Sequence, residues 1–458
     1  MLTKACVNGR KGETVALRPI DVSDFVDEAP VSRFQMAIFA VCGAIAMLDG
    51  FDAQMIGYVV PAIAKEWGIV GPAIGANFKW VFTWGLVGLM LGALAGGPAA
   101  DRFGRKTVML VSVAGFGLAM LASPFASGIV SLSVLRFLTG LGLGGSMPNT
   151  IALTAEFAPK RLRTTLITLM FSGFPIGNVL AGLVSVPLIE RFGWQGVFVV
   201  GGITPLLLLP IARMLLPESV RFQVVRGRDL ERAARTLRRI AFNSALGKAP
   251  LVLSEQTLEG IPVAHLFRSG RGSGTLLLWV AFFMTLLIIF FFVSWLPLLL
   301  GQVGLSAEHS IWTAALFNGG GTVGAVALGW LIDRSEPYRL VIGAYFAAAA
   351  AIASIAWAGA SLPLLVLTIF LTGFTVVGAQ SSINALAARL YPTSVRSTGV
   401  SWGLGIGRIG SIVGPYIGGV LLQLKWAPSD LFLLATIPAL VAGIAMIFMS
   451  RTELARYA

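Results

Sequence analysis

Two aspartates lie inside the first long apolar segment of the chain. Asp49 and Asp52 are three residues apart in the run MLDGFDAQMIGY, so a helix places them on one face. An ionised carboxylate at mid-bilayer depth costs roughly 2.5–3.5 kcal/mol on the insertion scale. Acids at this depth are therefore expected to serve an ion or substrate pathway. Two acids one turn apart in a low dielectric are expected to share one proton at neutral pH.

The composition is that of a polytopic membrane protein. Of the 458 residues, 56% are hydrophobic and 12% are charged, and an average soluble protein is about 25% charged. Hydropathy predicts an all-α protein of twelve transmembrane helices, because each apolar run is long enough to cross a bilayer. The predicted spans lie near 34–63, 74–98, 106–126, 129–154, 163–188, 194–215, 274–300, 309–332, 339–360, 362–388, 397–422 and 429–450.

Topology accounts for the net charge of +13 better than a nucleic-acid partner does. With both termini on the inner side, Arg136 and Arg408 fall within spans, and nearly all other Lys and Arg residues face inward. The Lys and Arg residues that fall outside are Lys65, Lys79, Arg191 and Lys425. We therefore expect a multi-pass protein of the bacterial inner membrane, with cytoplasmic termini and no nucleic-acid partner.

The sequence predicts no metal, no cofactor and no disulfide framework. His265 and His309 are isolated, and Cys6 and Cys42 are separated by the polar N-terminal segment. No nucleophile–base spacing indicates an enzyme. Residues 1–33 are mixed in charge and lack a cleavable signal pattern, so we expect them to form a mobile inner-side tail.

The chain contains two halves that repeat at an offset of 232–233 residues. Both copies have the same orientation, which predicts a parallel repeat of six spans about an axis along the membrane normal. The matching positions are Gly97, Asp101 and Arg102 with Gly329, Asp333 and Arg334; Gly88 and Gly92 with Gly320 and Gly324; Phe137 and Gly140 with Phe370 and Gly373; and Pro159 and Arg163 with Pro392 and Arg396.

This repeat divides the chain into five parts. They are a cytoplasmic tail (1–33), an N-terminal six-helix bundle (34–216), a cytoplasmic central loop (217–273), a C-terminal six-helix bundle (274–450) and a short cytoplasmic tail (451–458). Within the central loop, the basic amphipathic run from Asp229 to Arg239 predicts a helix that lies on the membrane face and is attracted to anionic lipid.

The intramembrane charges do not repeat. Arg136 aligns with Ile369, and Thr285 and Ile288 stand opposite Asp49 and Asp52. The C-terminal half has its own charge, Arg408, in the run GIGRIG. Groups that the fold requires should appear in both halves, whereas groups required by one ligand need appear only once.

Three motifs together resemble the aromatic acid:proton symporter family of the major facilitator superfamily, over residues 30–450. They are DxxD at Asp49, GxxxDRxGRK at 97–106 and RxxxGxGxG at 136–144. The resemblance implies that a monomer imports an aromatic carboxylate together with protons by alternating access. It implicates Asp49, Asp52, Asp101, Arg136, Glu156, Arg396 and Arg408 in transport. The second-half loop at Asp333 lacks the second glycine, which leaves its role less defined.

From this resemblance and from depth in the spans, we assign roles. The coupling proton is assigned to Asp49 or Asp52, with Glu156, and the substrate carboxylate to Arg136, Arg408 or both, because a guanidinium binds carboxylates bidentately. Ring contacts are assigned to Phe51, Tyr58, Trp295, Phe317 and Trp402. The gating loops contain Gly97, Asp101, Arg102, Gly104, Arg105, Arg163, Asp333, Arg334 and Arg396.

Several alternatives stay open at this stage. Arg136 could pair with an acid of its own half, and Glu156 could be a surface residue at a helix end. Pro217-Glu218-Ser219 also suits another proton-coupled organic-anion or sugar importer. A drug-efflux protein would be expected to have a glycine-proline run in the fifth span, but Gly414-Pro415 lies in the eleventh. A membrane receptor that binds without transport is the remaining alternative.

Overall fold

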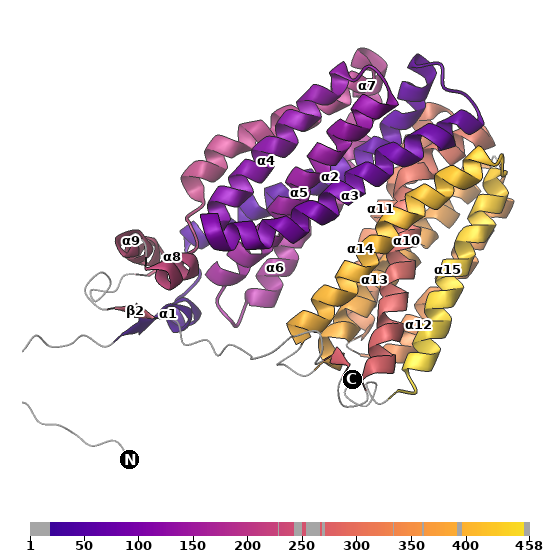
Figure 1. The fold of residues 1–458 in the computed structure, drawn as a ribbon. Helices are drawn as coiled ribbons and strands as arrows, with labels where there is room; N and C mark the ends of the chain where they lie inside the picture. Colours follow the sequence, from indigo (N-terminus) through magenta and orange to yellow (C-terminus); the bar gives the residue numbers. More distant parts are fainter. Residues whose placement is uncertain are drawn as a thin grey trace, which may run out of the picture.

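The computed structural model describes a helical bundle in two halves (Figure 1). The described residues are 19–227, 229–241, 250–252, 266–267, 271–332, 334–359, 361–391 and 396–452. The N-terminal half contains α2 (Arg33–Glu66), α3 (Pro72–Phe103), α4 (Arg105–Ala122), α5 (Ile129–Phe157), α6 (Arg163–Phe171) and α7 (Gly173–Leu215). The C-terminal half contains α10 (Gly272–Val303), α11 (Ala307–Ile332), α12 (Pro337–Ala358), α13 (Leu362–Leu390), α14 (Arg396–Gln423) and α15 (Pro428–Met449).

Within the described chain, eleven helical segments are long and apolar enough to cross a membrane. One of them, Thr165–Leu215, has 51 residues. At 1.5 Å per residue it measures roughly 77 Å, more than twice the thickness of a bilayer core. It breaks at Gly193, whose φ of 67° and ψ of −176° are not helical. This segment therefore supplies the fifth and sixth spans, and the predicted count of twelve is confirmed.

The predicted repeat appears in the way the helices pack. In the N-terminal half, α2 packs on α7, α3 on α5, and α4 on α5 and α7. In the C-terminal half, the equivalent helices make the equivalent pairs: α10 with α14, α11 with α13, and α12 with α13 and α15. The two halves are thus copies of one six-helix arrangement.

The glycines that match in sequence also match in contact. A Cβ added to Gly88 would overlap the backbone carbonyl of Phe137, and one added to Gly320 would overlap that of Phe370. Glycine is required at these positions because the helix backbones touch there, which is how small residues drive helix association in lipid. The interpretation of these glycines as a packing face is confirmed.

The two halves approach each other closely at one end only. We call the end where α4 begins with Arg105 the basic end, and the end where α2 finishes the opposite end. Between the halves, α3 packs on α14, α2 on α10 and α7 on α11. Gly75 lies against the backbone of Gly419, and Gly57 against that of Val293, all nearer the opposite end. Toward the basic end the halves diverge (Figure 1).

Part of the N-terminal segment that we expected to be a mobile tail is folded. Residues 20–28 form β1 (Ile20–Asp21) and α1 (Val22–Glu28), and β1 pairs in parallel with β2 (Leu251–Val252) of the central loop. Val22 and Val26 are buried in an apolar cluster that includes Phe34 of α2. The expectation of a mobile tail is therefore wrong for residues 19–32.

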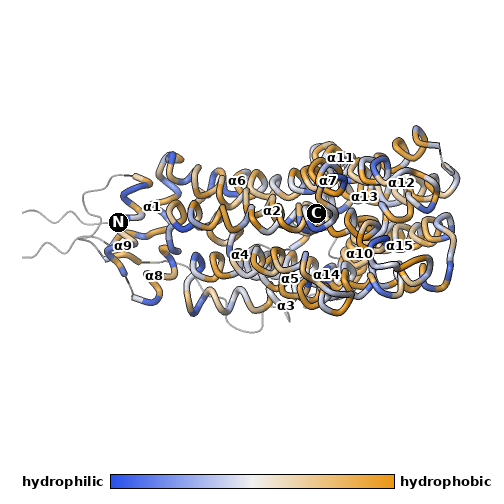
Figure 2. The backbone as a smooth tube through the Cα atoms, turned by 90° about the horizontal axis from the view of Figure 1, so that it is seen from above, coloured by the Kyte–Doolittle hydropathy of each residue, from blue (hydrophilic) through white to orange (hydrophobic). Residues whose placement is uncertain are grey.

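The central loop contributes α8 (Val220–Arg226) and α9 (Leu230–Ile240), which lie with α1 at one end of the N-terminal half (Figures 1 and 2). The predicted helix is present in α9. Its apolar residues Ala233, Leu237 and Ile240 are buried in the protein rather than turned to lipid. Arg239 lies over the ring of Phe34, 3.8 Å from its centroid. The apolar face of α9 is therefore not available to lipid, and the attraction of its basic residues to anionic lipid stays a prediction.

The backbone contact between α11 and α13 leads to a stability test. A Cβ at Gly373 would overlap the carbonyl of Phe317, so Gly373→Ala must push the two helices apart. Such overpacking costs about 1–3 kcal/mol. Gly343→Ala on α12 is the matched control, because nothing lies within 4 Å of its added Cβ. Thermal unfolding in detergent should show a lower midpoint for Gly373→Ala alone, and equal midpoints would contradict this packing.

Candidate functional site

Asp52 and Arg136 form an ion pair inside the N-terminal half. Arg136 Nη1 donates to Asp52 Oδ1 at 2.6 Å and Nη2 to Oδ2 at 2.7 Å, so the pair is bidentate. Each side chain is only 5% exposed. Of the two roles left open for Arg136, the structure displays the pairing with an acid of its own half. The guanidinium is occupied by Asp52 in this conformation.

The residues that replace this pair in the C-terminal half are apolar. Asp52 aligns with Ile288 and Arg136 with Ile369, and both isoleucines are fully buried in one apolar cluster. The fold can therefore be built at this position without charge. A buried ion pair is weak evidence for stability, because hydrophobic residues of similar volume often replace it without loss.

Asp49 of α2 and Arg408 of α14 belong to different halves and interact electrostatically, without a hydrogen bond or ion pair between them. Asp49 is 4% exposed, and its carboxylate makes no hydrogen bond or ion pair with the described residues. Arg408 is half-buried on α14, and its guanidinium likewise has no bonded partner in the described chain. Each acts on the other electrostatically. Unlike the guanidinium of Arg136, which is bonded to Asp52, the guanidinium of Arg408 is available to bind a ligand.

A chain of amides joins the two halves near the same depth. Asn318 of α11 donates to Gln54 Oε1 at 2.8 Å, and Asn178 of α7 donates to Asn318 Oδ1 at 3.1 Å. Gln54 follows Asp49 by five residues on α2, roughly 7.5 Å along the helix axis. Nearer the opposite end, Lys79 donates to Gln423 at 2.8 Å. Between described residues, these are the hydrogen bonds that connect the halves.

The aromatic residues assigned to ring binding divide into two groups. Phe317 stacks on Phe292 at 5.3 Å, and Trp295 donates to the Pro415 carbonyl and packs edge-on against Phe82. Both are core residues here. Phe51 packs toward Gly201 and Met120 within the N-terminal half.

The remaining two aromatic candidates have different surroundings. Trp402 is 43% exposed and stacks on Trp279 near the basic end, away from Arg408 on the same helix. Tyr58 is 1% exposed, and its hydroxyl lies near the Gln54 amide but makes no hydrogen bond of ordinary geometry with the described residues. Tyr58 is thus the one of the five assigned aromatics with an unsatisfied polar group.

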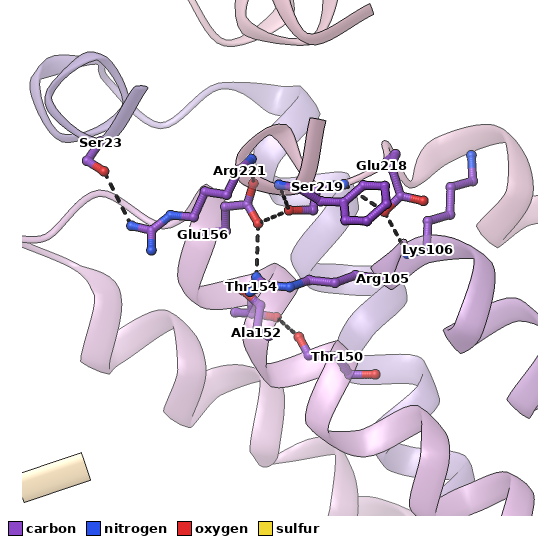
Figure 3. A network of polar contacts seen from close by, with 11 residues as sticks. Ser23, Arg105, Lys106, Thr150, Ala152, Thr154, Glu156, Glu218, Ser219 and Arg221 are labelled. Atoms are coloured by element: carbon purple, nitrogen blue, oxygen red, sulfur yellow. Dashed lines mark hydrogen bonds and ion pairs between the residues drawn. The ribbon is translucent and has the colours of Figure 1, made fainter. Parts of the chain in front are cut away.

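Glu156 belongs to a separate network at the basic end (Figure 3). Its carboxylate accepts from Arg105 Nη1 at 3.0 Å, from the Ser219 hydroxyl at 2.6 Å and from the Arg221 amide at 2.8 Å. It is 7% exposed, so it is not a free surface residue. It lies twenty residues beyond Arg136 on α5, roughly 30 Å along the axis. The structure does not bring it to Asp49.

Gly104 and Glu218 explain why the charged loop has its sequence. The chain turns between α3 and α4 at Gly104 alone, with a φ of 95° that favours glycine, whereas Gly97 is helical. Glu218 lies against Gly104, and its Oε1 accepts from the Lys106 amide at 3.0 Å in the first turn of α4 (Figure 3). A carboxylate there satisfies a free amide and complements the helix dipole.

The predicted contact between Asp101 and Arg163 is not made in this conformation. Asp101 is exposed, and its backbone carbonyl accepts from Arg226 at 2.8 Å. Arg163 pairs with Asp27 at 3.5 Å instead. Arg102 lies near Phe103.

The second-half counterpart of this loop is only partly described. Arg334 lies over the ring of Trp330, 3.9 Å from its centroid. Asp333 and the side chain of Arg396 are outside the described residues. The gating role of both loops stays a prediction.

Sequence reasoning missed the amide chain, the bridging role of Lys79 and the network role of Glu218. Lys79, expected on the outer side, is 8% exposed within α3. Gln54 and Asn318 are polar residues in apolar spans, which is the signal that could have found them. Their pairing depends on which helices meet, and periodicity does not supply that.

Two repeated six-helix halves, with buried charges where they meet, define a secondary membrane transporter rather than an enzyme. The family model for the Major Facilitator Superfamily matches residues 42–361 and 302–456. The chain belongs to this superfamily.

Curated relatives cover nearly the whole chain. A gallate transporter of Pseudomonas putida is 42% identical over 94% of this chain and 95% of its own length. The 4-hydroxybenzoate transporter PcaK of Pseudomonas aeruginosa is 42% identical over 94% of this chain and 96% of its own. A benzoate transport protein of Acinetobacter baylyi is 33% identical over 94% of this chain and 93% of its own.

Among solved structures, the xylose transporter XylE of E. coli, in a partially occluded inward-open conformation, superposes with a TM-score of 0.73. It is 16% identical, and the match covers 92% of this chain and 99% of that one. At this identity the likeness establishes the fold alone.

The apolar counterpart of the Asp52–Arg136 pair provides a test of its contribution. Arg136→Ile alone leaves a buried carboxylate without its cation, and we expect a loss of about 3–5 kcal/mol. Adding Asp52→Ile reproduces the isoleucines found at 288 and 369, and should recover most of that loss. Thermal unfolding in detergent measures both. A double variant no more stable than Arg136→Ile would show that the fold does depend on the charged pair.

Proposed function

We propose that this protein is a proton-coupled symporter that imports an aromatic carboxylic acid, such as 4-hydroxybenzoate, protocatechuate or gallate, across the bacterial inner membrane. The observation that supports this most directly is the unpaired Arg408 guanidinium opposite the unpaired Asp49 carboxylate. Relatives named as transporters of gallate, 4-hydroxybenzoate and benzoate support the substrate class.

Arg408 is the cation that a substrate carboxylate can reach at least cost. Binding to Arg136 would require breaking two short hydrogen bonds and leaving Asp52 buried without a partner. Arg408 has no such bond to lose. Its planar guanidinium can accept a carboxylate with two parallel hydrogen bonds.

Charge balance then links the substrate to a proton. One guanidinium at Arg408 can neutralise either ionised Asp49 or the substrate carboxylate, but not both. A proton on Asp49 restores neutrality when the anion binds, so anion and proton enter together. Asp52, already neutralised by Arg136, is left out of this exchange. We therefore assign the coupling proton to Asp49.

The orientation follows from the positive-inside rule, which places the basic end in the cytoplasm. Because the halves meet at the opposite end, we assign the described conformation to an inward-facing state. Outward opening requires the halves to part at Lys79–Gln423 and to close at the basic end. The Asp101 loop and its second-half counterpart are proposed to hold that other state.

The function is tested directly in proteoliposomes. An imposed inward proton gradient should drive accumulation of radiolabelled 4-hydroxybenzoate, and a protonophore should abolish it. A receptor would bind the acid without accumulating it, and an efflux protein would move it in the opposite direction under the same gradient. Labelled xylose serves as the test of the sugar-importer alternative.

The assignment of the proton to Asp49 predicts a specific defect. Asp49→Asn should lose gradient-driven accumulation, because no group remains to bring in the balancing proton. Exchange of internal for external 4-hydroxybenzoate should persist, since exchange needs no net proton movement. Asp430→Asn, an exposed change at the opposite end, is the control and should accumulate normally. Gradient-driven accumulation retained in Asp49→Asn would exclude this role.

Arg408 is expected to set affinity for the carboxylate. A hydrogen-bonded ion pair contributes about 1.5–3 kcal/mol, so Arg408→Ala should raise the KM for 4-hydroxybenzoate roughly ten- to hundredfold. Arg408→Lys should have a KM between those of the wild type and Arg408→Ala, because lysine keeps the positive charge but cannot donate two parallel hydrogen bonds. Arg191→Ala, an exposed arginine of α7, is the control. Initial uptake rates over a range of concentrations decide, and an unchanged KM in Arg408→Ala rules out the contact.

A further inference from the structure

We propose that Gln54, Tyr58, Asn178 and Asn318 form a subsite that hydrogen-bonds a hydroxyl group on the aromatic ring of the substrate. This inference rests on the proposed function, because it concerns the other end of the same aromatic acid. It adds a determinant of substrate choice that the charged residues do not provide.

The first support is a set of buried polar atoms left unpaired. Asn178 Oδ1 has no hydrogen-bond partner in the described chain, and the Tyr58 hydroxyl, which lies near the Gln54 amide, makes no hydrogen bond of ordinary geometry. The two residues are 6% and 1% exposed. A buried polar group without a partner costs about 1–3 kcal/mol, and such groups usually pair with something in the working molecule. Asn178 offers an acceptor and Tyr58 a donor that can also accept.

The second support is that these groups lie close together. Tyr58 follows Gln54 by one turn of α2, and Gly182 follows Asn178 by one turn of α7, so each pair shares a helix face. A Cβ built on Gly182 would lie 3.5 Å from the Tyr58 hydroxyl. The Tyr58 hydroxyl therefore lies beside α7, at the residue one turn after Asn178. The unpaired donor and acceptor border one small region.

The third support is the chemistry of the cluster. The three amides and the phenol carry no charge, so they suit a neutral group rather than a carboxylate. A ring hydroxyl both donates and accepts, which matches an unpaired amide oxygen beside an unpaired hydroxyl. The charged end of the same substrate is drawn to Arg408.

The placement of the two ends follows from the helix pairs. Arg408 is on α14, which packs on α3, whereas Asn178 and Asn318 are on α7 and α11, which pack on each other. The pair α2 and α10 also spans the boundary between the halves. A ring bound between the α3–α14 pair and the α7–α11 pair would point its carboxylate toward α14 and its opposite edge toward α7 and α11. The ring hydroxyl that the subsite hydrogen-bonds would then be para or meta to the carboxylate.

The amide chain also joins the halves, so a purely mechanical role must be distinguished. Asn318 belongs to the C-terminal half and bonds to both Gln54 and Asn178 of the other. These bonds must break or rearrange when the halves separate at the opposite end. A role limited to that step would affect every substrate equally, whereas a subsite discriminates between substrates with and without the hydroxyl.

The test compares uptake of benzoate, 3-hydroxybenzoate and 4-hydroxybenzoate in proteoliposomes. Wild-type protein should show a lower KM for at least one hydroxybenzoate than for benzoate. Tyr58→Phe should reduce that preference roughly two- to tenfold, the value of one neutral hydrogen bond. Asn178→Leu should reduce it further. Tyr345→Phe is the matched control, because its buried hydroxyl is already bonded to Thr285 at 2.6 Å.

The outcomes separate the two proposals. Wild-type protein that accumulates none of the three acids, and neither protocatechuate nor gallate, overturns the proposed function itself. Accumulation without any preference for a hydroxylated acid overturns the subsite alone. The subsite is also overturned if Tyr58→Phe and Asn178→Leu slow all three acids in parallel and keep their ratio. Because Tyr58→Phe removes one hydroxyl that makes no hydrogen bond of ordinary geometry, the test does not depend on the larger change folding.

Discussion

A carboxylate buried in a bilayer needs a positive charge or a proton, and the two acids of α2 meet this need differently. Asp52 is bonded bidentately by an arginine of its own half, so its charge is neutralised within that half. Asp49 faces Arg408 of the other half without bonding to it. The neutralisation of Asp49 therefore depends on the relative position of the two halves and on whether another anion is bound to Arg408. A buried acid with an unfixed partner is what coupling between an ion and a conformational change requires.

The repeat indicates which charges the fold itself needs. Backbone contacts at Gly88 and Gly320 are made twice, once in each half. The Asp52–Arg136 pair is made once, and Ile288 and Ile369 fill its place in the other half. The six-helix arrangement can therefore form with either a charged pair or two isoleucines at this position. The charged version, which costs desolvation and adds little net stability, occurs in the half that also carries Asp49.

Much of this architecture could be predicted from the sequence, because a span needs only length and apolar composition. The offset that relates Gly140 to Gly373 became a shared backbone contact in the structure. The partners of the charges could not be predicted. Whether Arg136 points to Asp52, to Asp49 or to a ligand depends on how α5 is rotated against α2. Glu218 reaches Gly104 because the chain folds back after α7, and hydropathy does not report such a return.

The two unpaired features of the centre complement each other in a way that neither does alone. In the proposed mechanism, Arg408 binds any organic anion of suitable size, so by itself it would account for binding but not for the choice of substrate. The amides and Tyr58 can hold any neutral hydrogen-bonding group, so by themselves they explain choice but not the need for a proton. An aromatic hydroxy acid has one group for each. Because the amides also bridge the halves, a ligand bound to Asn178 Oδ1 and the Tyr58 hydroxyl would lie beside the hydrogen bonds that must rearrange when the halves part. Recognition of the ring would then take place next to a contact that changes during transport.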